Sequence, residues 1–121
     1  MNLTANIRQA DSITILDITG RIVLGEETAA LRSLLNDLLG KGHNKILFNL
    51  GEVDYIDTAG LGFLISALAG VRKQGGELKL LKLTQKVQDV MQITKLYTVF
   101  DIFDDETTAR RAFGQSAVAK A

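Results

Sequence analysis

The chain has 121 residues, 46% of them hydrophobic, with 14 basic and 14 acidic side chains that cancel at neutral pH, and it has no cysteine. This length suits one compact domain with a hydrophobic core and is too short for two. The balanced charge gives no overall field to hold nucleic acid or an anionic membrane, and the lack of cysteine excludes disulfides, a thiol nucleophile and thiolate metal sites.

The N-terminal residues do not resemble a targeting signal. The sequence Met-Asn-Leu-Thr lacks the basic and apolar regions of a secretory signal, and no apolar stretch reaches the roughly 20 residues of a membrane span. We therefore expect a cytoplasmic protein that contacts neither nucleic acid nor a membrane directly.

Hydrophobic periodicity in the first half predicts strands on either side of a helix. Apolar and polar residues alternate over residues 3–7 and again over 13–18, which predicts an antiparallel hairpin. Residues 26–40 have helical spacing, begin with two glutamates and end in glycine. The consecutive apolar residues within 45–50 predict a central strand that is covered on both faces and ends at Leu50.

The second half continues the alternation. A loop after Leu50 leads into a helix, and a strand over residues 77–83 follows. Next come a helix that begins at Thr84, a short strand over 100–103 and a final helix over 104–113. Residues 114–121 have nothing large to bury, so we expect a disordered tail.

Together these elements predict an α/β fold. We expect residues 1–121 to form a single domain, with a core over about residues 3–113 and a mixed sheet of about five strands against which about four helices pack. Functional sites in such sheets favour the loops at the carboxyl ends of the strands. The segment over residues 55–62 is predicted to be such a loop.

This segment reads Tyr-Ile-Asp-Thr-Ala-Gly-Leu-Gly and joins a buried strand to a helix. Thr58 is expected in the first helical turn, near free backbone amides and the positive end of the helix dipole. From the local pattern alone, an ordinary N-cap at Asp57 or Thr58 is the more common explanation. Gly60 and Gly62 form neither a dinucleotide-binding motif nor a P-loop.

The helix after this segment has an apolar face that we expect to pack on the sheet. That face consists of Leu61, Leu64, Ile65 and Leu68. Phe63 falls on the opposite side of a helical wheel referenced to Leu61, so we expect it to point outward with Gly62, Ser66 and Gly70. An exposed aromatic side chain beside a helix start suits a docking surface for another protein.

Other combinations of polar residues carry less information. His43 is the only histidine, and its loop is already explained as the exit from a helix, so a catalytic role has little support. Glu52, Asp54 and Asp57 could suggest a cation site, but they lack a full ligand set. We therefore predict no catalytic residue, metal or cofactor, and no enzymatic activity.

The order of the elements resembles the anti-sigma factor antagonists of the STAS domain family, over about residues 7–113. The most specific features are the segment from Asp57 to Gly62, the Gly75-Gly76 turn with the strand behind it, and residues 94–103. The resemblance implies that Thr58, the hydroxyl residue after the aspartate, is a phosphorylation site. It also implies that the unmodified protein binds an anti-sigma factor with kinase activity and so releases a sigma factor, and that a separate phosphatase resets the switch.

We expect the docking surface to lie around the phosphorylation site. Its predicted residues are Asp57, Thr58, Ala59, Gly60, Gly62, Phe63 and Ser66. The sequence differs from the family at two places. Most antagonists have serine where this chain has Thr58, and the turn after the second strand, often acidic in the family, reads Arg-Ile-Val-Leu over residues 21–24.

Besides a phosphorylation-switched antagonist, the sequence leaves two alternatives open. The chain could be a STAS-like scaffold subunit of a larger signalling assembly, in which Thr58 is only a helix cap. The threonine favours this alternative slightly, because some scaffold members that the chain resembles carry threonine at this site. Binding of a small ligand is a third possibility, although no dedicated pocket motif supports it.

Overall fold

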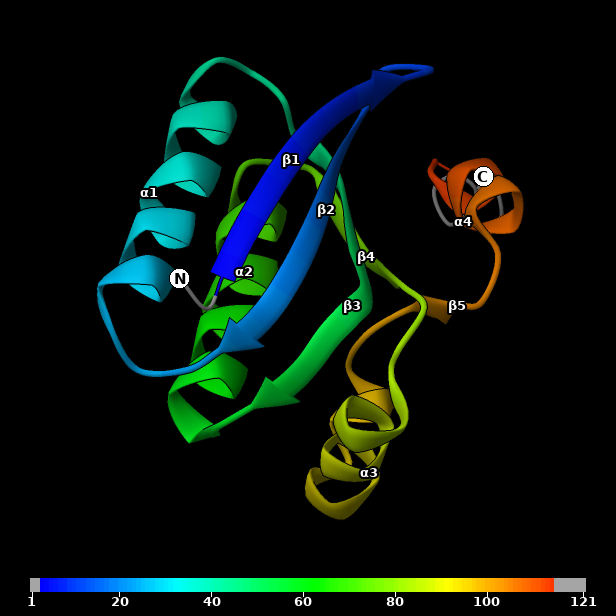
Figure 1. Cartoon of the computed structure of the whole chain (residues 1–121). Coiled ribbons are helices and arrows are strands. Elements are labelled where there is room, and N and C mark those ends of the chain that lie inside the picture. The colour runs from blue at the N-terminus through cyan, green and yellow to red at the C-terminus, as the bar shows by residue number, and fades with distance from the viewer. Residues whose placement is uncertain (1–2, 115–121) are drawn as a thin grey trace.

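A five-stranded sheet with the strand order β1-β2-β3-β4-β5 organises the chain in the computed structural model, which describes residues 3–114 (Figure 1). The strands are β1 (Leu3–Ala10), β2 (Ile13–Ile22), β3 (Lys45–Ile56), β4 (Glu77–Leu81) and β5 (Ile102–Phe103). β1 pairs antiparallel with β2, and the other neighbours pair in parallel. The predicted hairpin and the predicted mixed sheet are confirmed.

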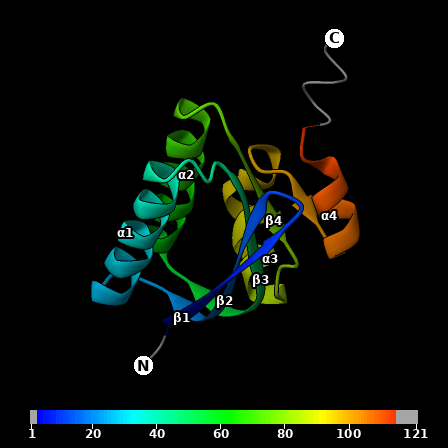
Figure 2. The same ribbon diagram turned by 90° about the horizontal axis from the view of Figure 1, so that it is seen from above.

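Four α-helices complete the fold. They are α1 (Glu26–Gly40), α2 (Thr58–Lys73), α3 (Gln85–Thr94) and α4 (Glu106–Ala112), with a short 3-10 helix, η1 (Leu96–Thr98), after α3. α1 and α2 lie side by side over one face of the sheet, and α4 lies on the other side (Figures 1 and 2). Within residues 3–114, no helix is long and apolar enough to cross a membrane.

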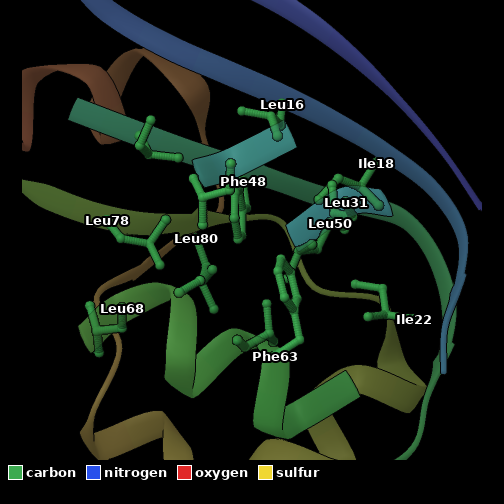
Figure 3. Packing of buried hydrophobic residues seen from close by; sticks show 14 of the residues in the cluster. Leu16, Ile18, Ile22, Leu31, Phe48, Leu50, Phe63, Leu68, Leu78 and Leu80 are labelled. Atoms are coloured by element: carbon green, nitrogen blue, oxygen red, sulfur yellow. The ribbon is translucent and has the colours of Figure 1, made fainter. Parts of the chain in front are cut away.

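The hydrophobic core is divided by the sheet because neighbouring strand residues point to opposite faces. Phe48 faces the larger cluster, beneath α1 and α2, where it meets Leu16, Ile18 and Leu80 (Figure 3). Leu47, next to Phe48 in the chain, belongs instead to the smaller cluster under α4. The central strand β3 is therefore covered on both faces, as its sequence predicts.

The strands differ in length from the prediction, and β1 and β2 are each longer than the alternating segments 3–7 and 13–18. β3 does not end at Leu50 but continues to Ile56, and this second half pairs only with β2, through irregular register. The open edge leaves Glu52 and Asp54 exposed, and these polar residues interrupt the apolar run in the sequence. β4 and β5 are shorter than predicted, since β4 ends at Leu81 and β5 has only two residues.

Side-chain caps define the starts of three helices. Asp57, Thr84 and Asp105 are the N-caps of α2, α3 and α4, and each side chain accepts a hydrogen bond from a backbone N–H three residues later.

The described part of the chain ends at Gly114, whose N–H donates to the Glu77 carboxylate at 2.8 Å. The tail predicted to be disordered lies outside the described residues apart from Gly114.

Candidate functional site

Asp57 connects the start of α2 to the loop between β2 and α1. Its Oδ1 accepts a hydrogen bond from the Gly60 N–H at 2.8 Å, and its Oδ2 accepts one from the Leu24 N–H at 3.0 Å. The Asp57 N–H donates to the Ile22 carbonyl at 3.3 Å. The Leu24 and Gly60 N–H groups hold the pKa of the Asp57 carboxyl below its usual value, so this side chain is anionic at neutral pH.

Thr58 is the first residue of α2, and its side chain is exposed. The sequence left open whether Asp57 or Thr58 caps the helix, and the structure assigns the cap to Asp57. The Thr58 hydroxyl is therefore not the cap of α2. Ala59, which follows, is half-buried.

Gly60 lies beneath the site and not on its surface. A Cβ atom at this position would stand 2.0 Å from the Ile22 carbonyl oxygen and 2.7 Å from the Ile56 side chain. Only glycine allows α2 to approach the end of β2 this closely. The expectation that Gly60 contributes to the outer docking surface is therefore wrong, because the residue is buried and instead sets the position of α2.

The prediction that Phe63 points outward is also wrong. Its side chain is 0% exposed and stacks on Phe48 of β3, with ring centroids 6.0 Å apart (Figure 3). The Arg32 guanidinium of α1 lies 5.4 Å from the centroid of the Phe63 ring. Phe63 therefore belongs to the core between the sheet, α1 and α2.

The error arises from the choice of Leu61 as the centre of the apolar face. At about 100° per residue, the buried residues of α2 span roughly 160°, with Leu61 at one edge and Phe63 at the other. The arc is this wide because α2 packs against both the sheet and α1. Ile65, which was expected to face the sheet, lies outside the arc and is 44% exposed.

The exposed side of α2 has low relief. It consists of Thr58, Gly62, Ile65, Ser66 and Ala69 near the N-terminal half of the helix. Ile65 is the only large apolar residue in this set, and the Ser66 hydroxyl accepts a hydrogen bond from Arg32 at 2.9 Å. The structure thus brings Asp57, Thr58, Gly62 and Ser66 to one region, with Ile65 in the place predicted for Phe63.

The β2–α1 loop adds residues to the site that the sequence does not predict there. Leu24 is 82% exposed, and its backbone is bonded to Asp57, 33 residues away in the chain. No local pattern could reveal this contact, although the apolar character of residues 21–24 was visible. A hollow of about 660 Å³ lies nearby at the ends of β2 and β3, where the Arg21 guanidinium stands 4.9 Å from the Tyr55 ring centroid.

Among the described residues, the structure does not complete the possible cation site or a catalytic site at His43. Glu52 and Asp54 are exposed on β3, and no group of three or more His, Asp or Glu residues within the described residues is arranged to hold a metal ion. His43 is half-buried in the turn after α1, where its backbone N–H donates to the Leu38 carbonyl at 2.9 Å.

The chain is similar in sequence to known proteins. The anti-sigma-B factor antagonist of Bacillus subtilis (strain 168) is 31% identical over 102 residues, which cover 84% of this chain and 92% of that protein. The TM1081 homolog of Thermotoga neapolitana is 35% identical over 71 residues, which are 59% of this chain and 63% of that protein. The match thus spans less than two thirds of the length of that relative.

Solved structures agree with the sequence comparison. The crystal structure of TM1081 from Thermotoga maritima matches with a TM-score of 0.81 at 25% sequence identity, covering 90% of this chain and 93% of that chain. The STAS domain family matches residues 4–109 of the sequence, which include the strands apart from Leu3 and the site around Thr58. The chain therefore belongs to the STAS domain family.

Proposed function

We propose that this chain is an anti-sigma factor antagonist whose binding is switched by phosphorylation of Thr58. The observation that carries the proposal is an exposed hydroxyl directly after the Asp57 cap, at the edge of a helix face made of small residues. Relatives named as anti-sigma factor antagonists support it. In the unmodified state, the site around Thr58 binds an anti-sigma factor, and the sigma factor is released by competition.

The small side chains on α2 allow close approach by a partner. Gly62 and Ser66 lie beside Ile65 and have small side chains. A partner can therefore pack closely against the helix and cover Ile65 as an apolar anchor. Buried anchors near the centre of an interface contribute most of its binding free energy. This arrangement assigns to Ile65 the role that the sequence suggested for Phe63.

Phosphorylation adds about −1.5 to −2 charges at the start of α2. The isolated domain tolerates them because a helix N-terminus favours anions, although the phosphate stands next to the anionic Asp57 carboxylate. In the complex, the same charge meets acidic or closely packed groups of the partner. A penalty of about 3 kcal/mol weakens binding roughly a hundredfold, so no large rearrangement of the domain is needed.

The kinase activity in this mechanism belongs to the partner. The anti-sigma factor binds ATP and transfers its γ-phosphoryl group to the Thr58 hydroxyl with release of ADP, and a separate phosphatase hydrolyses the phosphothreonine and restores the binding form. The chain itself needs no cofactor for this role.

A scaffold role is the second candidate, favoured by the threonine in place of serine. In that case the chain binds a signalling assembly without phosphate transfer. The sequence also allowed this role because Thr58 could be only a helix cap. That reason is weaker in the structure, because Asp57 and not Thr58 caps α2.

The test is incubation with the ATP-binding anti-sigma factors of the same genome, with ATP and Mg²⁺, reading complex formation and phosphate transfer together. Phosphopeptide mass spectrometry should place the label on Thr58, and Thr58→Ala should abolish it. Thr107→Ala is the matched control, because Thr107 is an exposed threonine in the first turn of α4 and its loss should leave labelling unchanged.

The binding measurement separates the two candidates. Calorimetry should show weaker affinity for authentically phosphorylated protein and for Thr58→Glu, with the smaller effect in Thr58→Glu because a carboxylate has less charge than phosphate. Label on another residue in Thr58→Ala, or affinity unchanged by phosphorylation, would contradict the switch and favour the scaffold role.

A further inference from the structure

Leu24 is an exposed leucine whose preceding peptide group is hydrogen-bonded at both its carbonyl and its N–H. Its N–H donates to Asp57 Oδ2 at 3.0 Å, and the carbonyl of the preceding Val23 accepts a hydrogen bond from the Thr28 hydroxyl at 2.5 Å. Gly25 follows with a φ of +152°, a conformation that other residues rarely adopt. The backbone before Leu24 is thus held in place by specific contacts, while its side chain is exposed.

The exposure of Leu24 is high for a residue so firmly placed. Its side chain is 82% exposed, and a large apolar side chain in water gains free energy when it is covered. A pre-ordered loop also loses little conformational entropy on binding. Both properties are those of an anchor that another molecule covers.

The position of Leu24 indicates which molecule covers it. Asp57 bonds the Leu24 N–H directly, and Thr58 is the next residue after Asp57, so the loop adjoins the proposed phosphorylation site. A partner that covers Thr58 therefore reaches Leu24 as well. A hollow of about 330 Å³, lined by Arg21 and residues 23–28, lies beside the leucine and offers room for partner side chains.

We propose that Leu24 is a second apolar anchor for the anti-sigma factor and that Asp57 is the positioning residue that holds it. This inference rests on the proposed function and specifies the partner's surface: an apolar recess for Leu24. Arg21, the one charged residue over 21–24, already faces the Tyr55 ring, while exposed Glu26 follows Leu24 at the start of α1. The recess should therefore be bordered by basic side chains, which complement Glu26.

The first experiment measures the affinity of Leu24→Ala for the cognate anti-sigma factor by calorimetry. We expect a loss of about tenfold or more, as for an interface anchor. Ile93→Ala is the matched control, because Ile93 is equally exposed, at 82%, but lies on α3. Its affinity should change less than about twofold. Equal effects of the two variants, or normal binding by Leu24→Ala, would overturn the role of Leu24.

The second experiment tests the positioning role with Asp57→Asn. The asparagine Oδ1 can still accept the Gly60 N–H and cap α2, but its amide nitrogen cannot accept the Leu24 N–H. The Leu24 amide should therefore exchange with solvent faster, and binding should weaken. In a Leu24→Ala background the same substitution should change affinity little, because the anchor that it positions is already gone. A full loss there would show that Asp57 contacts the partner directly and would overturn its positioning role.

Thr58→Glu distinguishes failure of this inference from failure of the proposed function. If Thr58→Glu weakens binding and Leu24→Ala does not, the switch remains and only the inference fails. If the wild-type protein binds no anti-sigma factor, the proposed function fails and the inference fails with it.

Discussion

Phe63 of α2 stacks on Phe48 of β3 with the ring planes inclined by 14° and the centroids 6.0 Å apart. Both side chains are fully buried, and the pair joins the helix that carries Thr58 to the central strand. Phe63→Ala should therefore leave a cavity and lower the free energy of unfolding by about 3 to 5 kcal/mol. Urea denaturation measures this change.

Ile65→Ala is the control on the same helix. Ile65 is 44% exposed, so its loss should cost less than about 1.5 kcal/mol of stability. Similar losses in the two variants would contradict the orientation of α2. If Ile65 is an interface anchor, Ile65→Ala should weaken partner binding while the fold stays intact.

Gly60 and Gly62 should respond oppositely to alanine. A Cβ at Gly60 would collide with the Ile22 carbonyl, whereas a Cβ at Gly62 meets nothing within 4 Å. Gly60→Ala should destabilise the domain by roughly 1 to 3 kcal/mol or more, because α2 must shift away from β2. Gly62→Ala should stabilise it by about 0.5 to 1 kcal/mol through the higher helix propensity of alanine. Thermal denaturation of both variants provides the measurement, and destabilisation by Gly62→Ala would contradict it.

The parts of the fold that could be predicted depend on local patterns. The alternation in residues 3–7 and 13–18 predicted the β1–β2 hairpin, and Asp57 was one of two residues identified as a possible cap for α2. Such features follow from the residues near them in the chain. The second half of β3 was missed because its buried residues, Leu50, Val53 and Ile56, recur every third position and do not alternate, where the pairing with β2 is irregular in register.

The parts of the site that were missed depend on neighbours distant in the chain. The burial of Phe63 requires α1 beside α2, which a wheel drawn for α2 alone does not contain. The bond between Leu24 and Asp57 joins two loops 33 residues apart. The need for glycine at Gly60 arises only where α2 meets the end of β2. The sequence thus located the segment that carries the site, while tertiary packing determines which of its side chains reach the surface.

Arg8 of β1 should stabilise the domain at neutral pH and not in acid. Its guanidinium bonds both oxygens of Asp17 on β2, at 2.5 and 2.9 Å, and Glu106 on α4 at 2.9 Å. These hydrogen bonds hold the pKa values of Asp17 and Glu106 below their usual range. A carboxyl with a lowered pKa stabilises the fold above its ordinary value of about 4, and the stabilisation is lost as the pH falls through the folded-state pKa.

Arg8→Met should therefore be about 0.5 to 1 kcal/mol less stable than the wild type at pH 7, a modest loss because all three side chains are partly exposed. The difference should shrink below about pH 4, where the carboxyls become protonated. Urea denaturation across this range measures it, with Arg72→Met, an exposed arginine on α2, as the control. A difference between wild type and Arg8→Met that does not change with pH would contradict the ion-pair explanation.

Asp57 and Thr58 are neighbours with separable roles in the stability of α2. The Asp57 carboxylate accepts hydrogen bonds from the Gly60 and Leu24 N–H groups, so Asp57→Ala removes both the helix cap and the link to the β2–α1 loop. Thr58→Ala removes only an exposed hydroxyl from the first turn and should change stability by less than about 0.5 kcal/mol. Asp57→Ala should therefore have the lower denaturation midpoint at pH 7.

The stabilisation by Asp57 should depend on pH, because the pKa of its carboxyl is lowered in the folded protein. The stability that Asp57 adds relative to alanine should be lost as the pH falls through that pKa. A Thr58→Ala midpoint as low as that of Asp57→Ala would show that the Thr58 side chain stabilises the helix start. Thr58 would then act as a structural residue, which favours the scaffold role.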